Sequence, residues 1–289
     1  MVKKLINYIK EAQLNSVALG HFNISNSEAL SGIFAGAKKL SLPVVIGVSE
    51  GERDFIGMKQ VVALVRSYKD EFDYPIFINA DHTYSFERAK EAIDAGVDSI
   101  VVDGSKLPLD ENIKLTKQCV EYARSVHRDI LVEAEIGYIG GSSKILDGIP
   151  DDVSIKNDDL PKVEDAKRLI DETGADLLAP AVGNIHGMMR IGHDPKLNID
   201  LIKALKEAIR VPLVLHGGSG NTDEDFKEAI KAGISMVHIN TEIRVAFKDG
   251  LKMSLQESPE EIAPYKILRE AVRMVEKKVE EKLILFNNL

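Results

Sequence analysis

PLVLHGGSG, residues 212 to 220, is the stretch of the sequence that decides the fold. Its apolar run between a proline and a glycine pair is typical of a short strand that is buried on both faces. Because side chains alternate along a strand, Val214 and His216 share one face, and the imidazole projects from the end of the strand. The glycines lead into a helix that Asn221 or Thr222 can cap. Such a turn offers backbone N–H groups to a phosphate, and the alternative is that the glycines only make a tight turn.

The same strand-then-helix unit recurs along the chain. Apolar segments predict eight strands, over residues 17–22, 43–49, 75–81, 98–105, 130–137, 176–183, 212–216 and 235–241. The helix after the second strand is expected near residues 56–68, and extra helices are expected at the N-terminus and over residues 264–286. Eight such units favour an α/β fold, a single (β/α)8 TIM barrel over residues 1–289 with an extra N-terminal helix and C-terminal helix. A doubly wound open sheet is the alternative.

Composition argues against several function classes. A formal net charge of −9 without a basic arm argues against a nucleic-acid or acidic-membrane partner. The N-terminal segment lacks the long apolar core of a signal peptide or membrane span. Cys119 is the single cysteine, which excludes an internal disulfide and a thiolate metal cluster. The sequence therefore predicts a cytoplasmic protein.

Polar side chains gather at the C-terminal ends of the predicted strands, which is where the active sites of TIM barrels lie. These residues are Asn23, Ser49, Asp81, His82, Asp103, Glu135, His186, His216 and Asn240. The loop of residues 140–160 follows the fifth strand and is too long for a plain connection. On this face of a barrel it would be a lid or binding loop.

Three histidines predict a metal site. His82, His186 and His216 follow the third, sixth and seventh strands, so they would converge on one barrel mouth. Three neutral imidazoles with an open fourth position make a catalytic Zn²⁺ site, although a single histidine is more often a core or surface residue. Three other histidines lack comparable placement and are expected to have ordinary structural roles: His21, His127 and His193.

Carboxylates accompany these histidines. Asp81 shares inward parity with Phe77 and Asn79, which suits a proton donor or acceptor beside the metal, or a residue that orients a ligand. Glu133 and Glu135 also point inward, and buried carboxylates need a cation or hydrogen-bond donors. Asp103 could join Glu135 around a second metal, and a salt bridge to a lysine is the alternative.

The loops after the seventh and eighth strands predict a phosphate site, because TIM barrels commonly bind phosphate there. Ser219 and Thr241 can donate hydroxyl hydrogen bonds, and the backbone N–H groups of residues 239–241 can complete the site. A small phosphorylated substrate whose oxygens also reach the metal is the simplest interpretation.

The motifs together resemble a known family. FNISN, SEG, ADH–SFExAxxAIxxGxxSIVVDGS, VEAEIGYIGG, AVGNIHG, PLVLHGGSG and INTEIR match, in order and spacing, the class II metal-dependent fructose-bisphosphate and tagatose-bisphosphate aldolases. The resemblance covers nearly the whole chain. It implies that His82, His186 and His216 bind the catalytic zinc and that Asp81 donates a proton. It also places Asp103 and Glu135 where the family can hold a second metal ion.

The resemblance also implies a set of substrate contacts, to dihydroxyacetone phosphate above all. They are Asn23, Ser49, Gly187, Gly217, Gly218, Ser219, His238, Asn240 and Thr241. Arg269 matches an arginine that some members present to the distal phosphate of a neighbouring subunit's substrate. The family is commonly dimeric or tetrameric, so a homodimer or homotetramer is expected.

The sequence departs from the family at four places. Thr83 stands where many members have glycine, His238 where asparagine is usual, and Asn240 where others have aspartate or alanine. The loop that usually carries an acidic residue for proton transfer reads Ser-Ser-Lys over residues 142–144. We expect an aspartate of the same loop to replace that acid, with Asp147 first because it lies closest in sequence, and with Asp151 and Asp152 as the alternatives.

The sequence thus predicts a zinc-dependent aldolase, a carbon–carbon lyase of glycolysis and gluconeogenesis. It would reversibly cleave fructose 1,6-bisphosphate into dihydroxyacetone phosphate and glyceraldehyde 3-phosphate. Zinc would polarise the ketone oxygen, and Asp81 would protonate the aldehyde oxygen in the condensation direction. The alternatives are an aldolase for tagatose bisphosphate or another ketose phosphate, another sugar-phosphate enzyme such as an epimerase, and a non-catalytic barrel that binds sugar phosphate.

Overall fold

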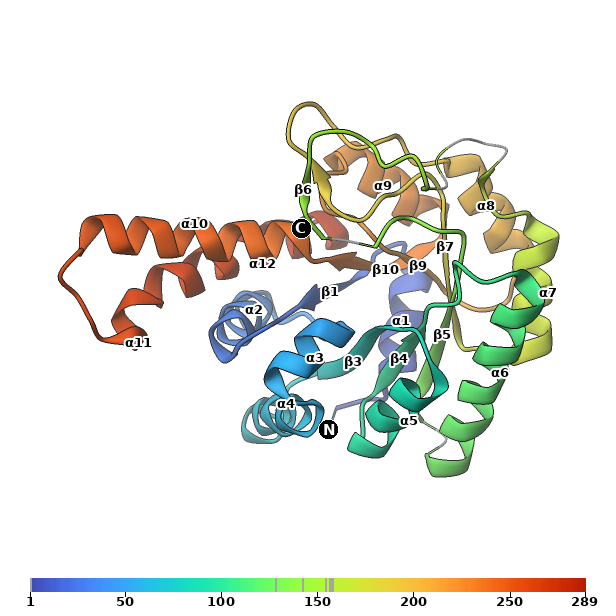
Figure 1. Cartoon of the computed structure of the whole chain (residues 1–289), viewed down its shortest axis with the longest axis horizontal. Helices are drawn as coiled ribbons and strands as arrows, with labels where there is room; N and C mark the ends of the chain where they lie inside the picture. The colour runs from blue at the N-terminus through green and yellow to red at the C-terminus, as the bar shows by residue number, and fades with distance from the viewer. Residues whose placement is uncertain (1, 128, 142, 154, 156–158) are drawn as a thin grey trace.

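Eight parallel strands close into a barrel in the computed structural model, which describes residues 2–127, 129–141, 143–153, 155 and 159–289 (Figure 1). Around the barrel they run in the order β1 (Leu19–Asn23), β10 (Ile234–Ile239), β9 (Leu213–Leu215), β7 (Leu177–Pro180), β5 (Leu131–Ile136), β4 (Ser99–Val102), β3 (Ile76–Thr83) and β2 (Val44–Val48). The first and last strands pair in parallel, His21 opposite His238. The predicted TIM barrel is confirmed, and the open sheet is excluded.

Helices surround the barrel and alternate with its strands along the chain (Figure 1). Those that follow the first seven barrel strands are α2 (Ser27–Leu40), α3 (Glu50–Ile56), α4 (Met58–Phe72), α5 (Phe86–Ala95), α6 (Leu109–Val126), α7 (Val163–Thr173), α8 (Ile199–Ala208) and α9 (Asp223–Ala232). Outward-facing strand residues such as Ile46 and Leu215 pack against them in the larger apolar core. Burial on both faces explains why the strands read as continuous apolar runs.

The N-terminal helix α1 (Leu5–Leu14) closes one end of the barrel. Its buried Ile9 and Ala12 pack in a second apolar cluster with inward-facing residues near the strand starts, such as Leu19 and Leu131. The barrel interior is therefore apolar at this end. Its polar interior lies at the opposite end, where the strands finish.

Two segments differ from the expected pattern. The helix predicted near residues 56–68 begins earlier and is two helices, α3 and α4, which Gly57 separates with a φ of +94°. In the long loop after β5, the short strand β6 (Ile145–Leu146) pairs with β8 (Met188–Met189) of another loop. A strand of two residues is too short to show a periodic pattern, so the sequence did not predict this pairing.

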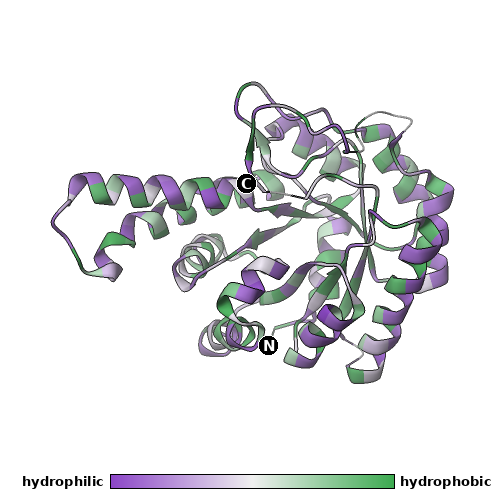
Figure 2. Cartoon of the chain, viewed as in Figure 1, coloured by the Kyte–Doolittle hydropathy of each residue, from purple (hydrophilic) through white to green (hydrophobic). Residues whose placement is uncertain are grey.

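The C-terminal segment forms an arm. It consists of α10 (Thr241–Glu257), α11 (Pro264–Ile267) and α12 (Arg269–Asn287). The helix α10 and the start of α12 run side by side beyond the barrel (Figure 1), and later residues of α12, such as Val279 and Phe286, pack in the larger apolar core. The two helices touch closely at Gly250, where a Cβ would lie 2.6 Å from the Cα of Ala271. Hydrophilic and hydrophobic residues alternate along the arm (Figure 2). Within the described ranges, none of these helices is both long and apolar enough to cross a membrane.

Candidate active site

A cavity of about 250 Å³ opens at the C-terminal ends of the barrel strands. Most of the residues that the sequence singled out line it: Asn23, Ser49, Asp81, His82, His186, Gly187, Gly217, Ser219, His238, Asn240 and Thr241. Other lining residues were not predicted, among them Glu50, Tyr84, Ser143 and Arg244. Side chains from both halves of the chain therefore meet in one pocket.

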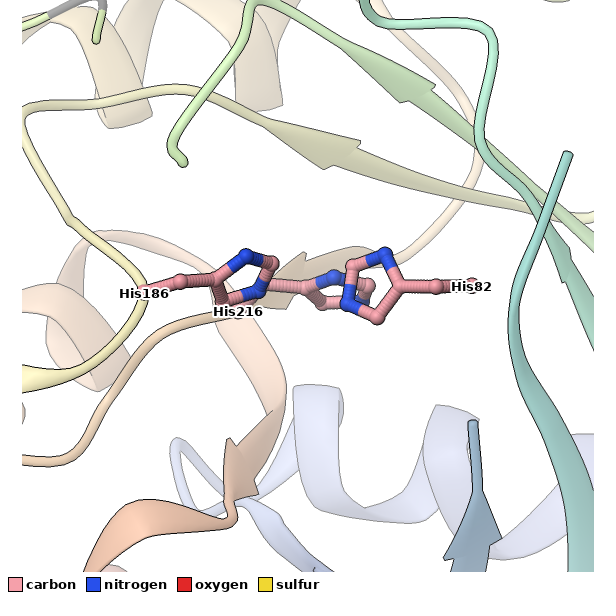
Figure 3. Close-up of side chains that lie close together, drawn as sticks. All are labelled: His82, His186 and His216. Carbon is pink, nitrogen blue, oxygen red and sulfur yellow. The ribbon is translucent and has the colours of Figure 1, made fainter. Parts of the chain in front are cut away.

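Three histidines converge at this pocket: His82 and His186 line it, and His216 is buried beside them. His82 lies at the end of β3, His186 follows β7, and His216 follows β9 (Figure 3). One ring nitrogen of each lies within 4.8 Å of one nitrogen of each of the others. This spacing places the three imidazoles where one metal ion can contact all of them.

Hydrogen bonds fix two of the rings in the orientation of metal ligands. His186 donates from Nδ1 to the carbonyl oxygen of Gly140 at 2.5 Å, and His216 Nε2 lies 2.6 Å from a carboxylate oxygen of Glu133. The second nitrogen of each ring is then left as an acceptor, as in histidines that bind metal with a carboxylate or carbonyl behind them. His216 Nδ1 is buried without a hydrogen-bond partner among the described residues. This donor set fits a zinc ion.

A β-bulge brings two consecutive residues into the pocket. The pairing of β3 with β4 shifts register between Ala80 and Thr83, and His82 has a φ of +39°, which is uncommon for a residue with a side chain. Asp81 points inward by strand alternation, and the bulge turns His82 to the same side. Strict alternation would have directed the His82 side chain away from the pocket. The uncommon backbone conformation at His82 is therefore what brings this side chain to the site.

Carboxylates surround the His82 ring. Its Nδ1 lies 3.0 Å from Asp103 Oδ2 and 3.2 Å from Glu135 Oε2. Burial lowers the pKa of His82, but Asp81 and Glu135 outweigh burial and raise that pKa well above its ordinary value. Burial, followed by Asp103, raises the pKa of Glu135 to about 8. Both Asp103 and Glu135 thus pair with a histidine rather than with the lysine considered above, in a cluster that favours a cation.

Asp81 is held by a neighbouring amide. Asn23 donates from Nδ2 to Asp81 Oδ2 at 2.9 Å, and Asp81 Oδ1 lies 3.5 Å from His238 Nδ1 and 3.7 Å from His82 Nε2. Burial alone would raise the pKa of Asp81, but His82 and His238 hold it well below its ordinary value. The carboxylate therefore faces the candidate metal ligands in its ionised form.

Glu52 organises the pocket wall, and the sequence analysis missed it. Its Oε2 accepts hydrogen bonds from Asn23 Nδ2 at 2.9 Å and from Ser49 Oγ at 2.9 Å, and its Oε1 accepts one from Arg244 Nη2 at 2.6 Å. Ser49 and Glu52 form the capping box of α3. The pattern Ser-x-x-Glu before a helix was the signal that could have identified this role.

A second missed residue lies inside the barrel. His21 was expected to have an ordinary role, yet it is fully buried and its ring stacks on that of His238, with centroids 3.4 Å apart and planes 3° apart. His238 stacks in turn on His216, with centroids 4.0 Å apart. Burial lowers the pKa of His21 to about 3, so its ring is neutral. Its shared parity with Leu19 and Asn23 on one strand could have indicated an inward position.

The glycine-rich turn lies beside the histidines. Gly217 has a φ of +58°, and a Cβ there would lie 2.3 Å from the carbonyl oxygen of Ile185, so only glycine fits. Gly218 does not line the cavity, and its N–H donates a hydrogen bond to His238 O at 3.1 Å. The helix α10 begins at the cavity with Thr241, and a helix N-terminus attracts anions. The turn and this N-terminus form the candidate phosphate site.

Four residues that the sequence singled out lie elsewhere. Asp147 is 79% exposed, is paired with Arg190 at 2.5 Å and does not line the cavity, and its pKa is lowered by that hydrogen bond. Asp151 and Asp152 are exposed as well. Arg269 is exposed at the start of α12 in the arm, so a single chain does not bring it to the pocket. Ser142 of the Ser-Ser-Lys segment lies outside the described residues.

Comparison with known proteins decides the family. The model of the class-II fructose-bisphosphate aldolases matches residues 3–289. The chain belongs to this family. It is a class II aldolase, a carbon–carbon lyase, and the resemblance noted in the sequence is confirmed.

Relatives of this class II aldolase differ in their named substrates. It is 36% identical over 278 residues to the 6-phospho-5-dehydro-2-deoxy-D-gluconate aldolase of Shouchella clausii, a match that covers 95% of this chain and 91% of that protein. It is also 36% identical over 278 residues to the fructose-bisphosphate aldolase of Geobacillus stearothermophilus, covering 94% and 92%. The YdjI aldolase structure from Escherichia coli K12 matches with a TM-score of 0.82 at 28% identity, covering 99% and 97%. The comparisons establish the reaction class rather than the substrate.

Proposed function

We propose that the protein is a zinc-dependent aldolase that reversibly cleaves fructose 1,6-bisphosphate into dihydroxyacetone phosphate and glyceraldehyde 3-phosphate. The observation that carries the proposal is the convergence of three histidines, two of which line the cavity, beside a glycine-rich turn and a helix N-terminus. A ketose 1-phosphate can place its phosphate in that turn and its carbonyl and hydroxyl oxygens toward the histidines.

His82, His186 and His216 would hold the zinc ion, and bound zinc supplies Lewis acidity toward a ketose oxygen. Asp103 and Glu135 orient His82, and with it they remain candidate ligands of a second metal ion. Asp81 takes the proton of the C4 hydroxyl during cleavage and returns it to the aldehyde oxygen during condensation.

Substrate binding falls to the rest of the cavity. Gly187, Gly217, Ser219 and the start of α10 bind the C1 phosphate, with Asn240 and Thr241 at the helix terminus. Asn23 and Ser49, which Glu52 holds in place, contact the sugar hydroxyls, and His238 borders the same space. Gly218 contributes by packing behind the turn.

The end of the substrate opposite the C1 phosphate raises a second candidate for the substrate. Among the described residues that line the cavity, Arg244 is the only lysine or arginine, and its Nη2 is paired with Glu52. A second phosphate would therefore need Arg269 from a neighbouring subunit. A carboxylate carries less negative charge than a phosphate and needs fewer cationic side chains. A substrate with a carboxylate at that end, as in 6-phospho-5-dehydro-2-deoxy-D-gluconate, is therefore the second candidate.

A homodimer or homotetramer is part of the proposal. The arm supports it, because Ile262 and Tyr265 near its tip are 88% and 72% exposed, and exposed apolar residues at a projecting tip favour contact with another copy. Such a contact is also the means by which Arg269 could reach a second active site.

The function is tested with the purified, zinc-loaded protein. We expect dihydroxyacetone phosphate to appear from fructose 1,6-bisphosphate, measured by its reduction in a coupled assay that consumes NADH. Tagatose 1,6-bisphosphate and 6-phospho-5-dehydro-2-deoxy-D-gluconate are compared through kcat/KM in the same assay. Formation of an epimer without dihydroxyacetone phosphate would indicate an epimerase, and tight binding without turnover would indicate a non-catalytic barrel.

The base that removes the proton from dihydroxyacetone phosphate requires its own test. Asp81 and Glu50 are the carboxylates among the described cavity residues, whereas Asp147 lies outside, paired with Arg190. We therefore expect Glu50→Gln to slow the exchange of that proton with solvent by about 10²-fold, the scale of lost general base catalysis. Asp147→Asn is the matched control and should exchange at the wild-type rate, as followed by NMR in D₂O.

The opposite result would support the prediction that Asp147, in the loop of residues 140–160, is the base. Slow exchange in Asp147→Asn with normal exchange in Glu50→Gln would show that the loop moves over the strand ends during catalysis. Exchange measures this step without carbon–carbon cleavage, so the result is independent of which aldehyde the enzyme accepts.

A further inference from the structure

Three imidazole rings are stacked beneath the active site. His21 and His238 lie face to face at 3.4 Å, and His238 and His216 lie at 4.0 Å with an angle of 23° between their planes. All three rings are buried. The stack begins in the barrel interior at β1 and ends at a proposed zinc ligand.

This arrangement does not suit a further metal ion held by His21, Asp81 and His238, although suitable ligand atoms lie within 4.8 Å of one another. The lone pair of an imidazole nitrogen lies in the plane of its ring. The planes of His21 and His238 are parallel within 3° and their centroids are 3.4 Å apart, so no single point lies in both planes. The two rings therefore pack against each other instead of sharing an ion.

Surrounding residues enforce the stack. Aromatic rings prefer offset or edge-to-face contacts, so a face-to-face pair requires support from outside. Gly47 leaves room for His21, because a Cβ at that position would lie 2.1 Å from His21 Cε1. At the same edge of the ring, Asn79 Oδ1 lies 3.3 Å from His21 Nε2, and Asn79 donates to Ser99 Oγ at 2.7 Å.

The middle ring touches both parts of the proposed chemistry. His238 Nδ1 lies 3.5 Å from Asp81 Oδ1, and the face of the same ring lies against His216. His216 is held at its outer edge by Glu133 at 2.6 Å. A tilt of His238 would therefore move the partner of Asp81 and release one face of His216.

We propose that His21 and His238 are positioning residues that act as one unit, holding the metal ligand His216 and the carboxylate of Asp81 in a fixed mutual geometry. The inference rests on the proposed function for the roles of His216 and Asp81. His21 does not line the cavity, and the ring that it contacts face to face is that of His238. A residue that merely fills the barrel would instead affect stability and leave the metal site unchanged.

The test uses the full-length protein loaded with Co²⁺, whose visible absorption reports ligand geometry, together with Zn²⁺ affinity measured by chelator competition. We expect His21→Ala to change the Co²⁺ spectrum and to weaken Zn²⁺ binding by about 10-fold, the lower range for loss of a residue behind a metal ligand. His21→Phe keeps a flat ring and should restore most of both properties. His127→Ala, an exposed histidine, is the control.

A double-mutant cycle tests whether His21 and His238 act as one unit. His238→Asn keeps a donor for Asp81 but removes the ring, and the double variant with His21→Ala should lose no more affinity than His238→Asn alone. Additive losses would overturn the proposal, as would an unchanged spectrum and affinity in a folded His21→Ala protein. If His21→Ala does not fold, His21→Phe decides by the same spectrum, because complete loss of metal there would show that stacking is not the role. None of these measurements needs a sugar substrate, so failure of the proposed function remains separately visible.

Discussion

Replacing His216 with alanine should abolish aldolase activity together with zinc binding. His216 is buried at the end of β9, with Nε2 bonded to Glu133 and Nδ1 without a hydrogen-bond partner among the described residues, so the change removes one of the three proposed zinc ligands. Metal content by elemental analysis and turnover in the coupled assay should fall together. In the wild-type protein, chelation should abolish turnover, and Zn²⁺ or Co²⁺ should restore it.

Two results would contradict this expectation. One is full activity in metal-free protein, and the other is a lysine Schiff base that borohydride traps with the substrate. Either would mean that the three histidines are structural and that the carbonyl is activated covalently. His127→Ala, an exposed histidine on the opposite side of the fold from the strand ends, should behave as wild type in the same measurements.

Asp81→Asn should keep the fold and the zinc but lower kcat by about 10²-fold or more, the scale of lost general acid–base catalysis. The change is nearly isosteric, and the amide oxygen of asparagine can still accept the hydrogen bond from Asn23 Nδ2. The group that it removes is the proposed proton carrier beside His82. The decisive measurements are kcat for the preferred ketose, metal content and the thermal unfolding midpoint.

A variant within a few-fold of wild type would remove Asp81 from the mechanism. Loss of zinc in Asp81→Asn would instead show that the carboxylate supports the metal site, since Asp81 Oδ1 lies 3.7 Å from His82 Nε2. Asn23→Ala provides a comparison, because it removes the amide that orients Asp81 and leaves the carboxylate. We expect a smaller loss of kcat there.

The sequence predicted those features that depend on local pattern. Alternation and apolar runs located the strands, and polar residues at the strand ends located the face on which His82, His186 and His216 converge. The glycine pair after the seventh strand predicted a turn beside His216, and the structure places Gly217 in a turn with a φ of +58°. These signals are local because they reflect the geometry of one strand or one turn.

The remaining features depend on neighbours that are distant in sequence. The bulge at His82 arises from pairing with β4, and strand periodicity cannot register an inserted residue. The stacking of His21 on His238 depends on β1 and β10 closing the barrel, and on the missing side chain of Gly47. Asp147 was chosen by its distance along the chain, whereas its ion pair with Arg190 comes from the pairing of β6 with β8.

The N-terminal helix α1 covers the end of the barrel that lies opposite the candidate active site. With α1 packed against the starts of the strands, the described residues leave the chamber beside the histidines open where the strands end. Both fragments of a cleaved sugar must leave by the route along which the sugar arrived. A fragment that stays bound blocks the next arrival, so the order in which the two products depart determines how quickly the chamber can be refilled.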